Sequence, residues 1–332
     1  MRTARTATAL AACAAVIALA AGCSGSGGKE SEDKADDAPG GGKVSGPRLK
    51  IGMVTHSGEG DSFWDIVQKG AEQAAAKDNV EFLYANNKEA KEQAELVQSY
   101  IDKKVDGLIV TLAKPDAMKD VLAKAAKAGI PVVTINSGAQ FSQKFGALTH
   151  IGQDEAVAGE AVGDELSKRG LKKALCVIHE QGNVSLEERC AGVKKTFKGS
   201  VENINVNGTN MPESQSTIQA KLDSGADYDV VVTLGAQYAE AAAQAKQDSG
   251  SKAEIDTFDL NKVVVGQLKS KAIGFAVDQQ PYLQGYLAVD GLWLHKTNAN
   301  VIGGGKPVLT GPAIVTGKDV PKLEKLTANG TR

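Results

Sequence analysis

From residue 48 onward, short apolar runs alternate with longer segments in which apolar residues recur at helical spacing. An apolar run followed by such a segment predicts a strand and then a helix. Because strands that are apolar on both sides need helices on both faces, we expect a parallel sheet built from βαβ units. The first series consists of strands at 49–55, 80–84, 107–111, 131–135 and around Ile151, and of helices at 63–76, 90–103 and 118–128.

A second series follows the same plan. It consists of helices at 155–168, 186–197, 215–221, 238–248 and 263–269, and of strands at 174–179, 201–205, 230–233, 254–258 and 273–277. A helix expected at residues 282–296 and an apolar tail at 308–315 come after this series, so we expect them to return and join two lobes. Ligands of such sheets bind beyond the carboxyl ends of the strands, and two lobes facing each other there form a cleft.

The predicted fold is therefore α/β, with two doubly wound parallel-sheet lobes joined by a multi-strand hinge. We expect the N-terminal lobe to comprise residues 48–151 plus about 280–311. The C-terminal lobe then comprises residues 152–279 plus about 312–330. The roughly 285 residues that follow residue 47 are sufficient for two ordinary domains.

The first 22 residues have the build of a signal peptide. They begin with Arg2 and Arg5, continue with an alanine-rich apolar run, and end in small residues before Cys23. The run is too short and too rich in alanine for a membrane span, so we expect it to be removed. The small residues before Cys23 resemble a bacterial lipobox, which implies lipidation of that cysteine; a secreted protein cleaved nearby without an anchor is the alternative.

Residues 23–47 are predicted to form a lipidated, disordered tether. They are rich in Gly, Ser, Lys, Asp and Glu and contain almost nothing apolar, so they cannot bury enough surface to offset the entropy of ordering. The formal charge of −2 becomes −4 after loss of residues 1–22, which contain two arginines and no acids. Acidic and basic residues are mixed along the helices, which excludes the basic surface of a nucleic-acid-binding protein.

The cysteines divide by position. Cys13 leaves with the signal peptide and Cys23 takes the lipid, so Cys176 and Cys190 remain as a pair. In an oxidising compartment this favours a disulfide, and two free buried thiols are the alternative. Two ligands without clustered histidines fall short of a metal site, so we expect no metal.

Polar and aromatic residues follow the predicted strands, at the edge where a ligand would bind. A sugar or polyol requires this mixture, because Asp, Asn, Gln and Arg can pair with hydroxyl groups while aromatic faces cover the C–H side. Such a site also rejects analogues, since a buried group left unpaired costs about 1–3 kcal/mol. The residues at these positions are Asp61, Phe63, Trp64, Asn136, Arg189, Asp259 and Gln279.

At these same residues the chain resembles the sugar-binding receptors of bacterial ABC importers, the ribose, galactose and xylose type of periplasmic binding protein with the type I fold. The resemblance covers nearly all of the chain after residue 47. Its marks, in this order, are Asp61-Ser-Phe-Trp64, Asp106-Gly-Leu-Ile-Val110, Gly129-Ile-Pro-Val-Val-Thr-Ile-Asn136, Ile151-Gly-Gln-Asp-Glu-Ala-Val-Ala-Gly159, Arg189-Cys-Ala-Gly192, Phe258-Asp259 and Val277-Asp-Gln-Gln-Pro-Tyr282.

Matching to this family implies that the strand-end residues above contact the ligand, together with Gln237. Two departures matter. Gly235 and Ala236 stand where the family often has an Asn-Asp pair, and Asn136 and Ser137 stand where a ribose receptor has an Asp and an Arg. A carboxylate and a guanidinium are therefore missing from the ribose pattern, which leaves another pentose, a hexose, a polyol or an inositol as the expected ligand.

Several of these residues also have a simpler structural interpretation. Asp61 can cap the helix that follows it, and Asp259 can be a turn residue. Phe63 and Trp64 can be core residues, although two adjacent aromatic residues cannot both face the core of one helix. Arg189 can pair with the acids just before it on a solvated face.

Catalysis and cofactor binding are not expected. The histidines, at positions 56, 150, 179 and 295, are scattered, and neither H-E-x-x-H nor G-x-S-x-G occurs. His56 and His179 fall at strand ends and can line the cleft, although a surface or supporting role is the simpler interpretation. The acids Asp154 and Glu155 open a helix, where capping explains them. Phe63 replaces the third glycine of a dinucleotide-binding loop, which argues against that cofactor.

We therefore expect a monomeric receptor, outside the cytoplasm and anchored by lipid to the outer face of the cell membrane. It would capture a small sugar or polyol by closing about its hinge and deliver it to an ABC permease and ATPase. A receptor of the same fold for a nucleoside or a furanosyl signal, or one that reports to a sensor protein, is the alternative. A sugar-responsive repressor shares the fold but would begin with a DNA-binding helix-turn-helix.

Overall fold

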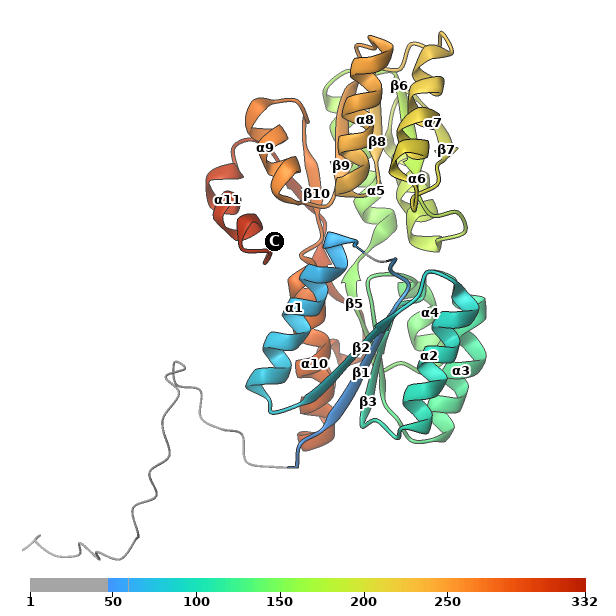
Figure 1. Cartoon of the computed structure of the whole chain (residues 1–332), viewed down its shortest axis with the longest axis vertical. Coiled ribbons are helices and arrows are strands. Elements are labelled where there is room, and N and C mark those ends of the chain that lie inside the picture. Colours follow the sequence, from blue (N-terminus) through green and yellow to red (C-terminus); the bar gives the residue numbers. More distant parts are fainter. Residues whose placement is uncertain (1–46, 59) are drawn as a thin grey trace, which may run out of the picture. The chain divides into compact units, whose positions relative to one another are not determined.

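The computed structural model describes residues 47–58 and 60–332. These residues form two six-stranded sheets, each flanked by helices (Figure 1). The predictions for residues 1–46, which include the signal peptide, the tether and Cys23, lie outside the described residues. The first sheet has the strand order β11-β5-β4-β3-β1-β2 and is parallel throughout. Its strands are β1 (Lys50–Thr55), β2 (Glu81–Asn86), β3 (Gly107–Val110), β4 (Val132–Ile135), β5 (Thr149–Gln153) and β11 (Val308–Gly311).

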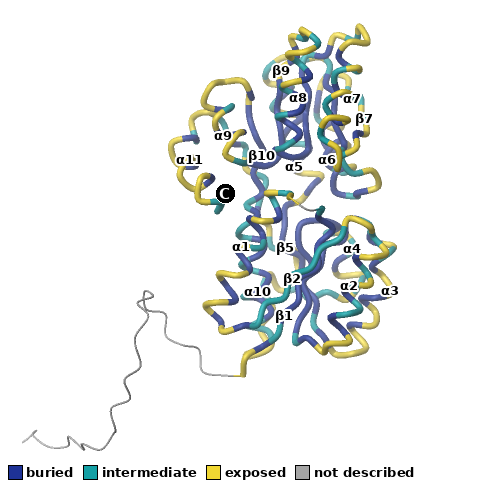
Figure 2. Tube along the Cα trace, in the orientation of Figure 1, coloured by how far each residue is buried: buried dark blue, intermediate teal, exposed yellow. Residues whose placement is uncertain are grey.

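Helices cover both faces of the first sheet because its central strands are buried on both sides (Figure 2). One core lies beneath α1 and α10, which are neighbours in space, and a second lies beneath α2 and α3. The helices of this lobe are α1 (Ser62–Lys77), α2 (Ala90–Asp102), α3 (Pro115–Lys127), α4 (Ala139–Ser142) and α10 (Pro281–Asn298), with short 3₁₀ turns at Gln143–Phe145 and Ile302–Gly305.

The second sheet repeats this plan with the order β12-β10-β9-β8-β6-β7, in which only β12 runs antiparallel. Its strands are β6 (Lys173–Ile178), β7 (Ser200–Asn205), β8 (Val230–Thr233), β9 (Glu254–Phe258), β10 (Ala276–Asp278) and β12 (Ala313–Val315). Its helices are α5 (Glu155–Lys168), α6 (Val184–Thr196), α7 (Met211–Asp223), α8 (Ala236–Ser249), α9 (Lys262–Ser270) and α11 (Val320–Ala328). One core contains residues of α5 and α6, and the other contains residues of α7, α8, α9 and α11.

The chain passes from one sheet to the other three times within the described residues. It leaves the first sheet between β5 and α5, returns between β10 and α10, and leaves again between β11 and β12, where the Gly311–Pro312 peptide bond is cis. Helix α10 packs on α1, and β11 pairs with β5, so both complete the first lobe after the second has been traced.

The predicted α/β fold of two parallel-sheet lobes is confirmed. Two local predictions were wrong, in addition to the short helix α4, which lies in a segment expected to be a loop. Residues 273–277 were expected to form a strand, but the ladder begins at β10, because the backbone N–H of Phe275 is taken by the Asp256 carboxylate at 2.9 Å. Helix α11 was not expected at all; it is nine residues long and buries only Val320, Leu323 and Thr327.

Candidate functional site

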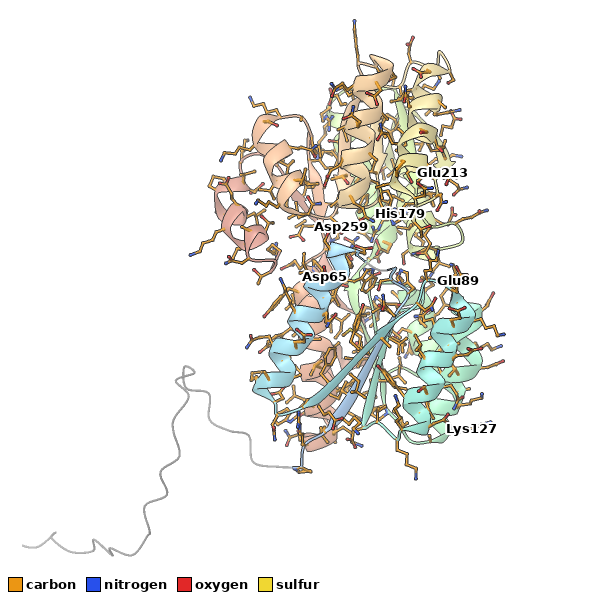
Figure 3. All side chains as sticks on the ribbon, in the orientation of Figure 1. Asp65, Glu89, Lys127, His179, Glu213 and Asp259 are labelled. Atoms are coloured by element: carbon orange, nitrogen blue, oxygen red, sulfur yellow. A yellow bond between two sulfur atoms is a disulfide. The ribbon has the colours of Figure 1, made fainter. Side chains whose placement is uncertain are left out.

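A cavity of about 650 Å³ lies between the carboxyl ends of the strands of the two lobes. This volume is within the range of about 300–1,000 Å³ that is typical of small-molecule sites. Every side chain predicted to contact the ligand lines it: Asp61, Phe63, Trp64, Asn136, Arg189, Gln237, Asp259 and Gln279. Figure 3 labels Asp259 and His179 of this lining at the carboxyl ends of β9 and β6, whereas Lys127 lies at the far end of α3.

The first lobe supplies a wall from the start of α1. Asp61 caps this helix, accepting a hydrogen bond from the Phe63 backbone N–H at 3.0 Å, and it also lines the cavity. Trp64 is buried in the core of the lobe and Phe63 is only partly buried, so the two rings face different surroundings. Trp64 contacts Phe63 and His56 edge to face, with ring centroids 5.1 and 5.0 Å apart. Asp61 therefore both caps α1 and lines the cavity, so its structural role does not exclude a role in binding.

Two of the predicted ligand residues have strained backbones at the ends of their strands. Asn136, after β4, has a φ of 61°, and Asp259, after β9, has a φ of 67°. Only a few per cent of non-glycine residues adopt this left-handed region, and Asn and Asp tolerate it best. Such strain persists where the surroundings enforce it and is concentrated at functional sites.

Two hydrogen bonds through the Gln279 side chain connect Asn136 with Asp259. The Asn136 amide donates to the Gln279 side-chain oxygen at 3.0 Å, and the Gln279 amide donates to the Asp259 carboxylate at 2.7 Å. Gln279 lies where the polypeptide crosses from β10 to α10, so these side-chain hydrogen bonds connect the two lobes at the hinge. Burial raises the pKa of Asp259 to about 7, although the Arg189 charge and the Gln279 hydrogen bond act in the opposite direction.

Arg189 lines the cavity from α6 and is buried. Its Nε and Nη2 donate to the two carboxylate oxygens of Glu155 at 2.6 and 2.9 Å, and its Nη1 donates to the Leu234 carbonyl at 3.0 Å. Its guanidinium also lies 4.7 Å from the centre of the Phe258 ring. Two interpretations are thereby corrected: Arg189 does not pair with the preceding acids, and Glu155 is a buried partner of Arg189, while Asp154 alone caps α5.

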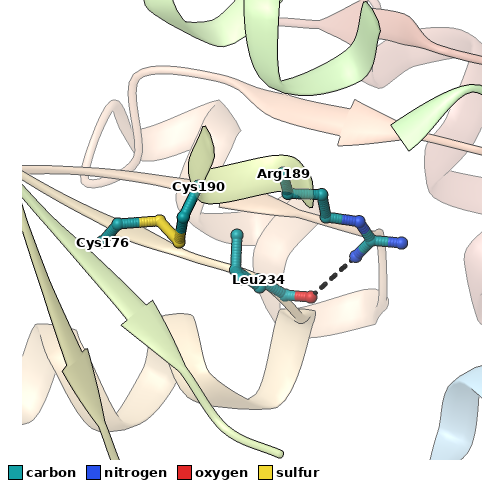
Figure 4. Close-up of a disulfide and its surroundings, with 4 residues drawn as sticks. All are labelled: Cys176, Arg189, Cys190 and Leu234. Atoms are coloured by element: carbon teal, nitrogen blue, oxygen red, sulfur yellow. Dashed lines mark hydrogen bonds between the residues drawn. A yellow bond between two sulfur atoms is a disulfide. The ribbon is translucent and has the colours of Figure 1, made fainter. Parts of the chain in front are cut away.

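Glycines allow this ion pair to form, because they let α5 and α6 touch backbone to backbone. A Cβ on Gly159 would lie 2.1 Å from the Arg189 carbonyl, and one on Gly192 would lie 2.4 Å from the Ala156 carbonyl. The next residue along α6, Cys190, forms a disulfide with Cys176 of β6 (Figure 4). The guanidinium is therefore held on a helix that is fixed to both α5 and the sheet.

The departure from the family pattern after β8 has a structural reason. The rings of His179 and Tyr238 stack with centroids 4.0 Å apart, and both line the cavity. A Cβ on Gly235 would lie only 3.2 Å from the Tyr238 ring and 3.4 Å from His179. Gly235 therefore leaves room for an aromatic pair, and Gln237 donates to the Tyr238 hydroxyl at 3.0 Å. Burial lowers the pKa of His179 to about 3, with the Arg189 charge acting in the same direction.

The two lobes also touch directly at the start of α6. The Val184 backbone N–H donates to the Ala113 carbonyl at 3.1 Å, and Lys114 lies 3.2 Å from the Glu180 carboxylate. The Asn183 amide lies 3.3 Å from the His56 ring, which also contacts Thr111 at 2.8 Å. Lys114 and His56 belong to the first lobe and Glu180 to the second, so these contacts bridge the cleft.

Sequence reasoning missed three pairings: Glu155 with Arg189, Tyr238 with His179, and His56 with Thr111 and Asn183. His56 and His179 had a signal, their places at strand ends, whereas capping of the helix start already accounted for an acid at Glu155. Within residues 47–58 and 60–332, no three metal-ligating side chains gather into one group. The same part of the chain contains no helix with the length and apolarity needed to span a membrane.

Comparison with known families is decisive. The family described as "Periplasmic binding protein domain" matches residues 51–298. The chain belongs to this family. The predicted resemblance is thus confirmed, as are the predictions that the protein is a binding protein and not an enzyme and that it acts outside the cytoplasm.

Two curated periplasmic binding proteins are among the relatives of the chain. It is 24% identical over 217 residues to the xylose/arabinose-binding protein of Sulfolobus acidocaldarius. The alignment covers 60% of this chain and 54% of that protein. The chain thus spans about half the length of that relative. The chain is also 25% identical over 236 residues to the ribose import binding protein of Bacillus subtilis. That alignment covers 69% of this chain and 75% of that protein.

A solved structure is more similar. The carbohydrate transporter from Acidothermus cellulolyticus 11B, in complex with myo-inositol, is 46% identical to this periplasmic binding protein and has a TM-score of 0.85. The alignment covers 86% of this chain and 100% of that chain.

Proposed function

We propose that this periplasmic binding protein captures a small uncharged sugar or cyclic polyol in the cleft between its lobes and delivers it to the permease and ATPase of an ABC importer. The observation that carries the proposal is the convergence on one cavity of all the side chains expected to bind ligand. They come from both lobes and combine amide, carboxylate and guanidinium groups with aromatic rings. This combination suits hydroxyl groups on one side of a ligand and C–H groups on the other.

The first candidate ligand is myo-inositol, since the most extensive similarity described above is to a carbohydrate transporter in complex with it. The absence of the ribose-type Asp and Arg at Asn136 and Ser137 agrees with a ligand other than ribose. Stacking of a nucleoside base is disfavoured, because His179 and Tyr238 already stack on each other. We expect the ligand to bridge the lobes and thereby favour the closed arrangement that the importer recognises.

The test is a titration of the purified residues 48–332 with a panel of pentoses, hexoses, polyols, inositols and adenosine. Binding is measured by calorimetry and by Trp fluorescence. Trp64 lines the cavity and Trp293 lies on α10, so a Trp293→Phe variant leaves Trp64 as the only reporter. One ligand of micromolar or tighter affinity is expected. No heat and no fluorescence change with any sugar or polyol would refute the proposal, and a response to adenosine alone would favour the nucleoside receptor.

The anchor is a separate part of the proposal. Cys23 would carry diacylglycerol, residues 23–47 would act as a tether, and the protein would work as a monomer at the outer face of the cell membrane. Mass spectrometry of the mature N-terminus distinguishes a lipidated Cys23 from an unmodified secreted protein.

A further inference from the structure

One buried cation with a permanent charge lines the cavity among the described residues, and a carboxylate neutralises it from behind. Arg189 is 3% exposed and Glu155 is 4% exposed. The two are joined by hydrogen bonds of 2.6 and 2.9 Å. Arg189 lines the cavity and Glu155 does not, so a ligand meets the guanidinium and not the carboxylate. Burial opposes the charge on Arg189, but the charge and hydrogen bonds of Glu155, together with the charge of Asp259, raise the pKa of the guanidinium.

The pair leaves part of the guanidinium available. A guanidinium has five N–H groups, and those of Arg189 make two bonds to Glu155 and one to the Leu234 carbonyl. One hydrogen on each terminal nitrogen has no acceptor among the described residues. Arg189 can therefore donate to ligand hydroxyl groups while the pair as a whole carries no net charge.

Groups from both lobes hold the Glu155 carboxylate in place. Gln153, the last residue of β5 in the first lobe, donates to one of its oxygens at 2.8 Å. Arg189 approaches from α6 of the second lobe. The carboxylate is thus fixed at the point where the chain first crosses between the lobes, and little freedom remains for it to move away when a ligand binds.

The other charges around the cavity offer nothing to an anion. Two acids, Asp61 and Asp259, line it, Lys114 pairs with Glu180 at 3.2 Å, and Lys88 is exposed. Burial raises the pKa of Asp61 to about 6 and that of Asp259 to about 7, so above about pH 7 an anionic ligand meets two carboxylates and no surplus buried positive charge. Placing like charges side by side in such a site is costly.

We propose that Glu155 is a specificity-determining residue: by neutralising Arg189 it makes the cavity select uncharged polyols and reject their anionic derivatives. The inference rests on the proposed function, because it assumes that the cavity binds a sugar or polyol. It assigns to Glu155 a role in selectivity and not merely in the stability of the second lobe.

The test compares matched ligands in matched variants. Wild-type protein is first titrated with the panel of sugars and polyols described above, myo-inositol and D-glucose included. If none of them binds, the proposed function is refuted and the inference falls with it. Glu155→Gln is then titrated with the neutral ligand that binds and with its anionic derivative, myo-inositol 1-phosphate or D-glucuronate. Asp256→Asn is the control, because Asp256 is a buried partner of Arg169 in the same lobe and does not line the cavity.

In Glu155→Gln, the ratio of anion affinity to neutral-ligand affinity should rise at least about tenfold, and in Asp256→Asn it should not change. Arg189→Gln leaves Glu155 unneutralised, so its preference should shift toward the amino derivative, scyllo-inosamine or D-glucosamine. The double variant Glu155→Gln with Arg189→Gln should again prefer the neutral ligand. If Glu155→Gln does not fold, Arg189→Gln and the double variant decide the question. Equal loss of affinity for neutral and charged ligands would overturn the inference.

Discussion

The two lobes build their walls of the cavity in different ways. The wall of the first lobe is local: Asp61, Phe63 and Trp64 are neighbours in sequence and are positioned by the start of one helix. The wall of the second lobe brings together Arg189 and Asp259, which lie 70 residues apart, and depends on a buried ion pair and a disulfide. A local wall can be assembled from capping and aromatic packing, whereas a wall with buried charge requires partners delivered by the tertiary structure.

Removing the buried cation Arg189 should have the largest effect, and it tests whether the wall of the second lobe depends on buried charge. Arg189→Ala leaves Glu155 buried without its partner, and we expect a loss of about 3–5 kcal/mol in the free energy of unfolding together with ligand binding weakened by about tenfold or more. Urea denaturation and calorimetric titration measure the two effects. Arg169→Ala is the matched control, since it also deprives a buried acid, Asp256, of its partner. If that variant weakened ligand binding equally, the special place of Arg189 in the wall would be refuted.

The disulfide sharpens the comparison by separating stability from binding. Replacing Cys176 and Cys190 by Ala should lower the free energy of unfolding by about 3 kcal/mol, because the bond closes a loop of roughly 15 residues. Ligand affinity should change little, since Glu155 and Leu234 still hold the guanidinium. Thermal unfolding with and without reductant measures the first effect. A loss of affinity that exceeds the loss of stability would mean that the bond itself aims Arg189.

One of the buried acids of the second lobe, Asp259, should make stability depend on pH. Burial raises the pKa of Asp259 to about 7 in the folded protein, compared with about 3.9 in an unfolded chain. The folded state then holds the proton more tightly, so this group's contribution to stability is present below pH 4 and is lost as the pH rises through about 7. The charged groups around it are Arg189, Glu155 and Asp61.

Asp259→Asn should therefore remove a decline of up to about 2 kcal/mol between pH 5 and pH 7 in the unliganded protein. Thermal unfolding across this range tests it, with the exposed Asp223→Asn as the control. Parallel pH profiles for wild type and Asp259→Asn would contradict the assignment.

The smallest effect is expected in the local wall. Phe63→Ala removes a partly buried ring that contacts Trp64 edge to face, so ligand affinity should fall about tenfold while stability falls by about 1 kcal/mol. Phe141→Ala, which removes another partly buried ring of the same lobe, should leave affinity unchanged. Equal binding by wild type and Phe63→Ala would show that this wall does not touch the ligand.

The contrast between the walls also explains what could be predicted. Helix α5 and the strands β8 and β9 have the bounds expected from their apolar patterns, because those patterns are determined by burial against a sheet. Helix α11 has too few buried positions to stand out from a loop. The start of β10 depends on a side chain of another strand, Asp256, which no local pattern reveals.

The site follows the same division. Asp61, Phe63 and Trp64 could be placed by their spacing after a strand. The role of Glu155 could not, because capping already accounts for an acid at a helix start and the partner lies 34 residues further on. His179 and Tyr238 meet only through the side-by-side packing of β6 and β8. Pairings of this kind depend on which helices and strands become neighbours.

The late return of the chain to the first sheet affects the order of assembly. Ala288, Val289 and Leu292 of α10 belong to the same core as Ile51 and Trp64. During synthesis from the N-terminus, β6 to β10 emerge before α10. The parallel strands of the second sheet can therefore associate before α10 completes the first lobe. The first lobe is thus incomplete until α10 and β11 arrive, and the second lobe waits in turn for β12 and α11. Until α10 arrives, an apolar face under α1 is open to chaperones and to aggregation.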